Sequence, residues 1–253
     1  MPTHSGGRHE NGQNFLTNTT IATEIVGLVS RTSGPIVEIG PGDGALTVAL
    51  ERLGRPLTAV EIDHRLAESI RRKAPRTTVI RGDFLDYRLP LEPHTVVGNL
   101  PFHLTTAILR KLLHAPGCAD AVLLTQWEVA RRRAGVGGST MMTAQWLPWF
   151  EFRLVQRVPA ASFTPRPSVD GGLLTMTRRS DPLIAPEHRK RYAAFIHAAY
   201  TGRGHGLPEV LGRVTNRPRA QVQRWTNEQG LGATALPRDL SAVQWADAFR
   251  LFS

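Results

Sequence analysis

Apolar and polar positions follow two different periods over the first half of the chain. Short apolar runs of strand length are followed by longer segments in which apolar residues recur at helical spacing, from about residue 20 to residue 125. The pattern predicts strands at 36–39, 57–62, 77–82, 95–98 and 121–125, and helices at 21–30, 46–52, 65–73 and 105–113. This alternation is typical of an α/β, doubly wound sheet of parallel strands, in which ligands bind at the carboxyl ends of the strands.

The pattern changes in the last part of the chain. Residues 152–158 and 173–177 have the composition of extended strands, and a proline-rich turn lies between them. From residue 178 onward the pattern predicts four short amphipathic helices. They lie at 186–200, 207–215, 219–228 and 241–251, the last with Ser241 as its N-cap. We therefore expect an α/β domain over residues 1–177 and a small helical domain over residues 178–253.

Composition narrows the class of protein. A chain of 253 residues can bury a full core and suits one large domain plus a small one. The single cysteine, Cys118, excludes a disulfide framework and a multi-cysteine zinc site, so we predict a reducing compartment and no metal. Residues 1–14 lack the apolar segment of a signal peptide, and no apolar run approaches the ~18 residues that span a membrane. We expect a soluble, cytoplasmic monomer that does not associate with membranes.

The charge of the chain points to a polyanionic partner. The formal net charge is +10 and the sequence pI is about 11.0, and cationic surfaces gain free energy by releasing the counterions condensed on nucleic acid. Residues 178–253 carry twelve Arg or Lys and six Asp or Glu, whereas the first 177 residues carry nineteen and fifteen. The sequence therefore predicts that the helical domain is a basic, RNA-binding domain.

A glycine loop follows the first predicted strand directly. Residues 38–44 read Glu-Ile-Gly-Pro-Gly-Asp-Gly, with Gly40, Gly42 and Gly44 in the loop and a predicted helix from Ala45. A strand, a glycine loop and a helix in this order are the context in which a nucleotide-type cofactor binds. The spacing also fits a loose dinucleotide fingerprint, because the form with alanine at its third position is satisfied.

Acidic residues around the loop distinguish the two cofactors. Glu38 and Asp43 would repel the pyrophosphate of a dinucleotide, whereas S-adenosylmethionine carries a cationic sulfonium and an ammonium group that carboxylates favour. Glu61 follows the strand-like run 57–60 and precedes Ile62, near the end of the next predicted strand, where a carboxylate can accept hydrogen bonds from both ribose hydroxyls. A solvated acid at a strand end is the alternative for Glu61, and the order of loop, helix and acid favours the cofactor role.

A third acidic position follows the third predicted strand. Asp83, next to Phe84, could accept a hydrogen bond from the amino group of the cofactor's adenine. Its alternative role is the cap of a turn or helix. These two residues complete the set around the expected cofactor site.

The tetrapeptide Asn99-Leu100-Pro101-Phe102 indicates chemistry on an amino group of a base. The lone pair of adenine's exocyclic nitrogen is delocalised into the ring, so a catalyst must hold the amino hydrogens with acceptors. The side-chain oxygen of Asn99 and the carbonyl of Leu100 can supply two, while Pro101 fixes the backbone and offers no N–H. Phe102 offers a face on which the base can stack, a contact worth about 1–3 kcal/mol. A turn whose phenylalanine fills the core is the alternative.

Two further segments are candidates for RNA contact. The proline-braced loop 162–170 presents Phe163, which we expect to form a second aromatic wall around a flipped base, although a packing role in a rigid connector is the alternative. Arg131, Arg132 and Arg133 precede a glycine-rich segment and are candidates for a phosphate clamp. Arginines also suit helix C-termini for electrostatic reasons alone.

With these residues assembled, the chain resembles the rRNA adenine-N6 dimethyltransferase superfamily, whose fold is a Rossmann-like methyltransferase sheet. Residues 12–16, Gly-Gln-Asn-Phe-Leu, match the N-terminal cofactor motif of the family, which implies that Gln13, Asn14 and Leu16 line the methionine end of S-adenosylmethionine. The glycine loop, Glu61, Asp83, the tetrapeptide at 99–102 and the loop at 163–170 match family motifs in order. The resemblance covers nearly the whole chain.

Within the superfamily, residues 99–106 and 126–132 most resemble the Erm branch, which implies an adenine of 23S rRNA as target, methylated before ribosome assembly is complete. It also implies resistance to macrolides, lincosamides and streptogramin B. The nearest alternative is a 16S rRNA dimethyltransferase of small-subunit maturation, although Phe102-His103 stands where those enzymes usually carry Tyr-Asn. A non-catalytic RNA-binding factor on the same fold and a hydride-transferring oxidoreductase are further alternatives. The intact tetrapeptide argues against the first of these, and the acids at the loop and the basic tail argue against the second.

Overall fold

The computed structural model describes residues 14–232 and 234–253, which form two compact units. The first unit comprises the described residues up to Ala130 together with Arg153–Thr177. The second comprises Arg131–Phe152 together with Arg178–Ser253. The chain therefore enters the helical unit twice, and residues 131–152, which the sequence analysis placed in the α/β domain, belong to the helical unit.

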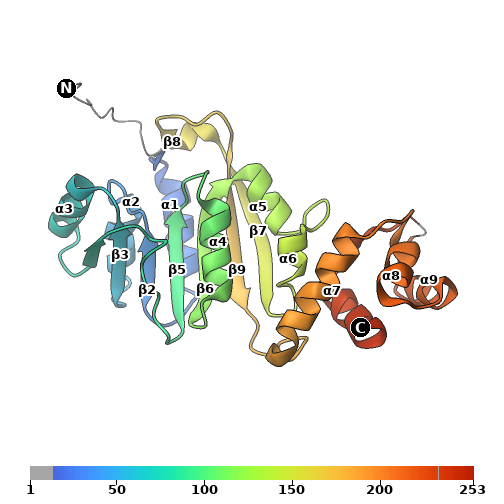
Figure 1. Ribbon diagram of the computed structural model, residues 1–253. Helices are drawn as coiled ribbons and strands as arrows, with labels where there is room; N and C mark the ends of the chain where they lie inside the picture. Colours follow the sequence, from blue (N-terminus) through green and yellow to red (C-terminus); the bar gives the residue numbers. More distant parts are fainter. Residues whose placement is uncertain (1–13, 233) are drawn as a thin grey trace, which may run out of the picture. The chain divides into compact units, whose positions relative to one another are not determined.

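A seven-stranded sheet forms the centre of the first unit, in the order β4-β3-β2-β5-β6-β9-β7 (Figure 1). Neighbouring strands from β4 to β6 are parallel, and β9 runs antiparallel to β6. The strands are β2 (Ile36–Ile39), β3 (Leu57–Glu61), β4 (Thr78–Arg81), β5 (His94–Asn99), β6 (Cys118–Gln126), β7 (Phe150–Val158) and β9 (Gly171–Arg178). The order reverses between β2 and β5, and such a switch point opens a crevice at the carboxyl ends of the strands.

Helices cover both faces of this sheet. Figure 1 shows α1 behind the sheet and α4 in front of it. Side-chain caps fix two helix starts, because Asn18 accepts hydrogen bonds from the backbone of α1 and Asp63 accepts them from the backbone of α3. The helices are α1 (Thr19–Val29), α2 (Ala45–Glu51), α3 (His64–Lys73), α4 (Thr105–His114) and α5 (Trp127–Arg133), the last of which crosses the boundary between the units. The predicted α/β fold is confirmed.

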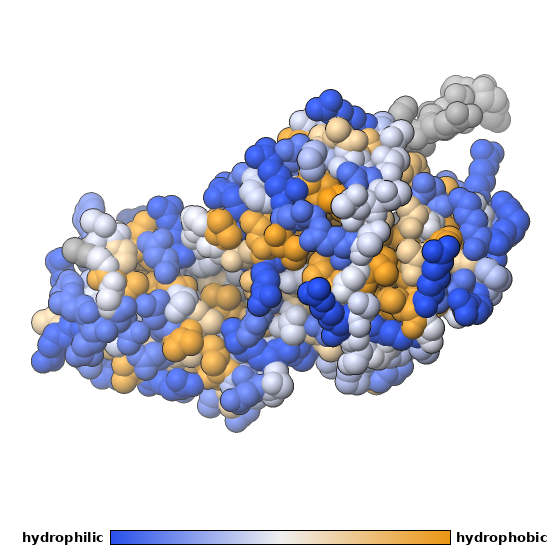
Figure 2. All heavy atoms as spheres, turned by 180° about the vertical axis from the view of Figure 1, so that it is seen from behind, coloured by the Kyte–Doolittle hydropathy of each residue, from blue (hydrophilic) through white to orange (hydrophobic). Residues whose placement is uncertain are grey.

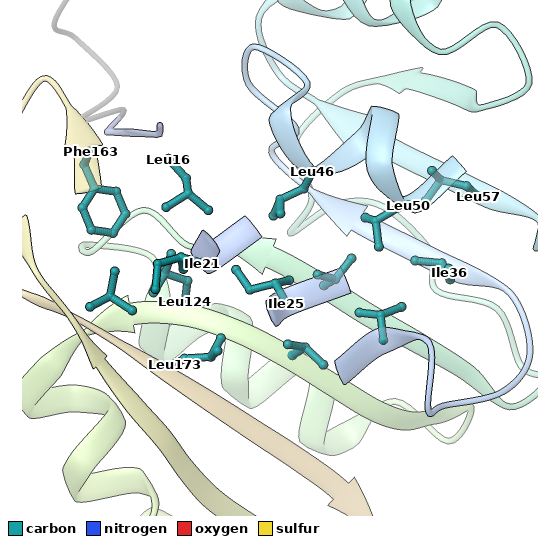
Figure 3. Packing of buried hydrophobic residues seen from close by; sticks show 14 residues of the cluster. Leu16, Ile21, Ile25, Ile36, Leu46, Leu50, Leu57, Leu124, Phe163 and Leu173 are labelled. Carbon is teal, nitrogen blue, oxygen red and sulfur yellow. The ribbon is translucent and has the colours of Figure 1, made fainter. Parts of the chain in front are cut away.

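The core behind the sheet joins sequence-distant segments. Apolar side chains of α1 and α2 pack against β2, β3 and the start of β9, and the cluster also includes Leu16 and Phe163 (Figure 3). These two residues belong to a short antiparallel ribbon, β1 (Phe15–Leu16) with β8 (Phe163–Thr164), in which Leu16 lies opposite Phe163. A single 3₁₀ turn, η1 (Ala160–Ser162), precedes β8. The ribbon attaches the start of the described chain to the segment between β7 and β9.

The second unit has an aromatic core of its own. Tyr192 is fully buried, and its ring lies edge-on to Trp149 at 5.4 Å and to Phe249 at 5.3 Å between centroids. Because Trp149 lies in residues 131–152, this packing explains why that segment joins the helical unit. Its elements are α6 (Met141–Ala144), η2 (Pro186–His188), α7 (Arg189–Thr201), α8 (Leu207–Thr215), α9 (Arg219–Glu228), η3 (Pro237–Asp239) and α10 (Ala242–Phe252). Ser241 caps α10 as predicted, by accepting a hydrogen bond from Gln244 N.

Hydrophilic residues cover most of the surface seen from behind, with apolar residues visible in the gaps between them (Figure 2). Among the described residues, no helix is both long enough and apolar enough to cross a membrane. Within residues 14–232 and 234–253 there is also no group of three His, Cys, Asp or Glu side chains that could hold a metal ion.

Candidate active site

A cavity of about 310 Å³ opens at the carboxyl ends of β2, β3, β4 and β5 in the first unit. It therefore lies where the strand order reverses. Its walls are Asn14, Phe15, Leu16, Glu38, Ile39, Gly40, Pro41, Gly42, Asp43, Ala45, Leu46, Val60, Glu61, Ile62, Gly82, Asp83, Phe84, Leu85, Asn99, Leu100, Pro101, Phe102, His103, Leu104 and Ile108. Nearly all of the residues predicted for cofactor binding and catalysis are in this set.

The glycine loop needs its glycines for backbone conformation and for close packing. Gly40 and Gly42 both have positive φ, +57° and +59°, a region that disfavours residues with a Cβ. A Cβ on Gly42 would also lie 2.9 Å from two ring atoms of Phe15. The loop and β1 therefore approach each other so closely that only glycine fits between them.

Glu61 holds this loop in place. Its Oε2 accepts a hydrogen bond of 3.0 Å from Gly42 N, and its Oε1 accepts one of 2.9 Å from Asp63 N. Glu61 is 2% exposed, and burial raises the pKa of its carboxyl, although hydrogen bonds from the backbone act in the opposite direction. Each carboxylate oxygen has a second lone pair, so Glu61 can still accept hydrogen bonds from a ligand in the cavity.

Glu38 is the most unusual carboxyl group of the site. It is 1% exposed, and its Oε2 atom is buried without a hydrogen-bond partner. Burial, together with the nearby charges of Glu61 and Asp43, raises the pKa of Glu38 to about 8. Thr47 faces the group and lowers the pKa, but its hydroxyl forms no hydrogen bond of standard geometry with Glu38. The free protein therefore contains a buried carboxylic acid that is largely neutral at pH 7.

The tetrapeptide after β5 is held from both sides. Asn99 Nδ2 donates a hydrogen bond of 2.6 Å to the carbonyl oxygen of Asn14, and Leu100 N donates one of 2.8 Å to Leu124 O. The carbonyl oxygen of Pro101 accepts from Leu104 N at 3.0 Å and so begins α4. These contacts use one N–H of the Asn99 amide and the N–H of Leu100, so the side-chain oxygen of Asn99 and the carbonyl oxygen of Leu100 can act as the two acceptors expected from the sequence. Phe102 is half-buried at the edge of the same cavity.

The charges on the cavity wall select the kind of ligand. Four carboxyl groups line the cavity, from Glu38, Asp43, Glu61 and Asp83, and no Lys or Arg of the described chain is among the lining residues. A pyrophosphate would meet these acids without a compensating cation, whereas a cationic ligand would be attracted. The cavity thus fits the cationic methyl donor expected from the sequence and disfavours a dinucleotide.

The other cofactor residues expected from the sequence divide into three groups. Asn14, Leu16, Ile62 and Phe84 line the cavity with the acids. Asp83 also caps a local turn, because its Oδ1 accepts a hydrogen bond of 2.8 Å from Leu85 N. The third glycine of the loop, at position 44, is the N-cap of α2 and does not line the cavity, and the glutamine at position 13 lies outside the described residues.

Phe163 does not line the cavity, which corrects the expectation that it forms a second wall around a base. Its side chain is 4% exposed and points into the core behind the sheet together with Leu16 (Figure 3). The reason is the pairing of β1 with β8, which places Phe163 opposite Leu16 and brings its ring to 3.2 Å from the Cβ position of Gly171. This is the packing role that the sequence analysis gave as the alternative.

The three consecutive arginines do not join the cavity either. Arg131, Arg132 and Arg133 form the last turn of α5 and belong to the second unit. Arg131 Nη1 donates a hydrogen bond of 3.2 Å to Val136 O, and Arg133 Nη1 donates one of 2.8 Å to Thr140 Oγ1. At least two of them therefore stabilise the segment that follows α5.

Several wall residues were not predicted individually. Phe15 lies inside the motif at 12–16, and His103 directly follows the tetrapeptide. Their position next to predicted site residues could therefore have indicated that they line the cavity. Leu46 and Ile108 reach the cavity from α2 and α4. Their apolar periodicity in the sequence cannot distinguish a side chain that lines a cavity from one that fills the core.

Three comparisons with known proteins identify the family of this chain. Residues 5–253 match the family described as ribosomal RNA adenine dimethylase. An rRNA adenine N-6-methyltransferase of Corynebacterium diphtheriae is 58% identical over 215 residues, which cover 84% of this chain and 85% of that protein. The mycinamicin-resistance protein MyrB of Micromonospora griseorubida is 47% identical over 249 residues, which cover 98% of this chain and 79% of the relative.

The solved structures give the same result for the fold. The crystal structure of the 23S rRNA methyltransferase ErmE superposes with a TM-score of 0.86 at 34% identity, covering 94% of this chain and 99% of that one. The fold of this chain therefore matches that of a solved 23S rRNA methyltransferase.

Proposed function

Since the chain belongs to the ribosomal RNA adenine dimethylase family and is an rRNA adenine-N6 methyltransferase, we propose that its methyl donor is S-adenosylmethionine and its target an adenine of 23S rRNA. The observation that carries the cofactor assignment is the cavity wall, which has four carboxyl groups and, among the described residues, no Lys or Arg. S-adenosylmethionine supplies a methyl group already activated on its sulfonium, so no covalent enzyme intermediate is required.

The residues of the first unit divide the work of binding this cofactor. Glu61, which already fixes the glycine loop through Gly42 N, accepts hydrogen bonds from the ribose hydroxyls with its remaining lone pairs. Asp83 accepts one from the adenine amino group, and Phe84 packs beside it in the wall. Asn14 and Leu16 enclose the methionine end from β1 and the residue before it.

The tetrapeptide holds the target base. The Asn99 side-chain oxygen and the Leu100 carbonyl accept the two amino hydrogens of the adenine, and this turns the nitrogen lone pair towards the methyl group. Phe102 stacks on the flipped base. Phe163 acts indirectly, by holding β8 and therefore β1 against the cofactor loop.

We assign RNA binding to the second unit because most of the positive charge lies there. Residues 131–152 and 178–253 carry fifteen Arg or Lys and seven Asp or Glu, a surplus of eight out of the total of ten. Arg189 lies over the ring of Trp146 at 4.1 Å, and Arg178 lies over Phe150 at 4.4 Å, so aromatic faces hold these guanidinium groups. Arginines held in this way suit contacts to phosphates and bases.

The choice of 23S over 16S rRNA rests on the names of two relatives. One is a mycinamicin-resistance protein and the other a 23S rRNA methyltransferase. We propose that this chain acts as a monomer in the cytoplasm on 23S rRNA before ribosome assembly is complete. Methylation of the adenine nitrogen then removes a hydrogen-bond donor and adds bulk where macrolides, lincosamides and streptogramin B bind.

Incubation of rRNA with radiolabelled S-adenosylmethionine, followed by primer extension and mass spectrometry, tests this function directly. We expect label in one adenine of 23S rRNA and weaker binding of erythromycin to ribosomes that contain the modified RNA. Label in 16S rRNA alone, with unchanged drug binding, would show instead that the protein methylates 16S rRNA during small-subunit maturation. An absence of label with either RNA, despite RNA binding, would favour the non-catalytic RNA-binding factor.

A further inference from the structure

We infer that Glu38, which is buried among the other carboxyl groups of the cavity wall and whose Oε2 has no hydrogen-bond partner, gives up a proton when S-adenosylmethionine binds and so selects the charged methyl donor over its product. The inference rests on the proposed cofactor and adds a proton to its binding reaction. The O–H bond of the Glu38 carboxyl breaks, the proton passes to solvent, and the resulting negative charge faces the cationic ligand.

No Lys or Arg of residues 14–232 and 234–253 lines the cavity around Glu38. Three other acids line the same cavity, Glu61 on β3, Asp43 in the glycine loop and Asp83 after β4. The loop after β5 contributes His103 to the wall. Lys73 on α3 approaches the loop from outside the lining set, and its Nζ donates to the main-chain oxygen of Asp43 at 2.6 Å. The charged groups that act most strongly on Glu38 are therefore the carboxyls of Glu61 and Asp43.

The carboxyl of Glu38 is also short of hydrogen bonds. Its Oε2 is buried with no partner, a situation that is unfavourable for a neutral polar group and more unfavourable for a charge. Burial and the two neighbouring acids raise its pKa to about 8, in agreement with this geometry. A ligand that brings positive charge into the cavity lowers the pKa of Glu38, because it favours the ionised form of the carboxyl.

The donor and the product differ by this charge. S-adenosylmethionine carries a sulfonium, an ammonium and a carboxylate, a net charge of about +1 at pH 7. S-adenosylhomocysteine retains the ammonium and the carboxylate but has an uncharged thioether. A buried carboxylate consequently gains more from the donor than from the product. Ionisation of Glu38 thus favours donor binding and product release at the same site.

The sign of the linkage follows from the direction of the pKa shift. Donor binding lowers the pKa of Glu38. At any pH between its pKa in the bound protein and its pKa in the free protein, binding therefore releases a proton, and donor affinity increases with pH up to about 8. Above that pH the carboxyl is already ionised in the free protein, and the dependence disappears. The affinity for the product changes less over the same interval.

Isothermal titration calorimetry on the 253-residue chain near pH 7 measures the released proton directly. Titrations of S-adenosylmethionine in phosphate and in Tris differ in enthalpy by the number of protons released times the difference in buffer ionisation enthalpy. We expect the parent protein to release between roughly half a proton and one proton per donor, and distinctly less per S-adenosylhomocysteine. The preference for donor over product should increase by about tenfold from about pH 6 to about pH 8.

The variant Glu38→Gln tests whether Glu38 is the source of the released proton. Glutamine resembles the neutral acid in shape, so we expect it to fold, to bind the donor, and to lose both the proton release and the pH-dependent preference. Asp83→Asn is the matched control, because it replaces another carboxyl of the same wall. It should weaken donor binding yet keep the proton release.

The possible failures are distinct. If S-adenosylmethionine does not bind the parent protein, the proposed cofactor is wrong. If it binds without buffer-dependent enthalpy, or if Glu38→Gln releases the same number of protons, the role of Glu38 is overturned while the cofactor assignment stands. The titrations of the parent protein require no variant, so an absence of proton release would overturn the role of Glu38 even if Glu38→Gln misfolds.

Discussion

Asn99 and Asn14 are linked by a hydrogen bond of 2.6 Å, from the side-chain nitrogen of Asn99 to the main-chain oxygen of Asn14. The two residues are 85 positions apart in the sequence. The bond fixes which end of the Asn99 amide is the donor end, so the oxygen is oriented as the acceptor. A backbone carbonyl of the N-terminal segment thereby prepares the proposed catalytic group before any substrate binds.

Replacement of this group should abolish methyl transfer. We expect Asn99→Ala to reduce single-turnover methylation by about 10²–10³-fold, the range seen when one pre-organised hydrogen-bonding group of an active site is removed. Asn99→Asp should also be impaired, because a carboxylate would face the Asn14 carbonyl where the amide donated. Calorimetry with S-adenosylmethionine serves as the control for an intact site. Turnover within a few-fold of the parent for either variant would exclude the acceptor role.

Two glycines with the same backbone conformation should differ in their tolerance of alanine. Gly40→Ala and Gly42→Ala both place a Cβ at positive φ, which costs about 1–2 kcal/mol. Only Gly42→Ala also brings the Cβ to 2.9 Å from the ring of Phe15, and overpacking adds about 1–3 kcal/mol. Urea unfolding of the cofactor-free proteins measures both losses. Equal losses would mean that Phe15 moves aside at no cost.

The two phenylalanines should separate stability from turnover. Phe163→Leu leaves a gap in the core and should lower the free energy of unfolding by about 1–2 kcal/mol, with nearly normal turnover per folded molecule. Phe102→Leu should leave stability within about 0.5 kcal/mol and reduce turnover, because a base loses its stacking surface. Thermal melts and single-turnover assays compare the two. The opposite assignment would return Phe163 to the substrate site.

The stability of the free protein should depend on pH in a defined direction. The pKa of Glu38 is about 8 in the folded protein and lies near its ordinary value of 4.5 when unfolded, so the unfolded chain binds fewer protons between these values. The contribution of Glu38 to the free energy of unfolding is consequently greatest below about pH 4.5, and it decreases as the pH rises to about 8. Glu38→Gln should flatten this decrease. Burial also raises the pKa of Glu61, so part of the pH dependence should remain in this variant. Urea unfolding at several pH values measures the slope, and an unchanged slope in the variant would contradict the assignment.

The arginines held on aromatic rings should contribute to RNA affinity. Arg189→Ala removes the guanidinium over Trp146 and should weaken binding of 23S rRNA fragments, with the salt slope reduced by about 1 if one phosphate contact is lost. Arg71→Ala, which removes an arginine paired with Glu68 on α3 of the first unit, is the control of equal charge change. Filter binding over a salt series distinguishes them, and equal effects would show that total charge alone matters.

The sequence predicted the elements of the first unit well because each has a strong local signal. The strand at 36–39 and the glycine loop after it are both local patterns, and the predicted bounds of β2 match those observed. The short ribbon of β1 and β8 had no such signal, since its two residue pairs are separated by 149 and 147 positions in the sequence. Pairing of that kind depends on tertiary structure and leaves no period in the sequence.

The site was predictable where chemistry and spacing coincide, and less so where packing decides. Glu38, Glu61 and Asn99 lie at strand ends and were expected in the cavity that they line. Phe163 was expected there from its loop, but its pairing with Leu16 turns it into the core. The membership of residues 131–152 in the helical unit likewise depends on aromatic contacts, which the strand and helix periods do not contain.

The ribbon of β1 and β8 has a consequence for the order of events during synthesis. Translation produces Phe15 early, but its segment has no partner strand until Phe163 and Thr164 have also left the ribosome. Chains are made at about 5–20 residues per second, so the wait lasts roughly 7–30 seconds. During that interval the glycine loop lacks the completed strand pair that brings Phe15 against Gly42. A nascent chain therefore reaches cofactor-binding competence only after almost the entire first unit has been made, and a truncated product that ends before residue 163 should be inert.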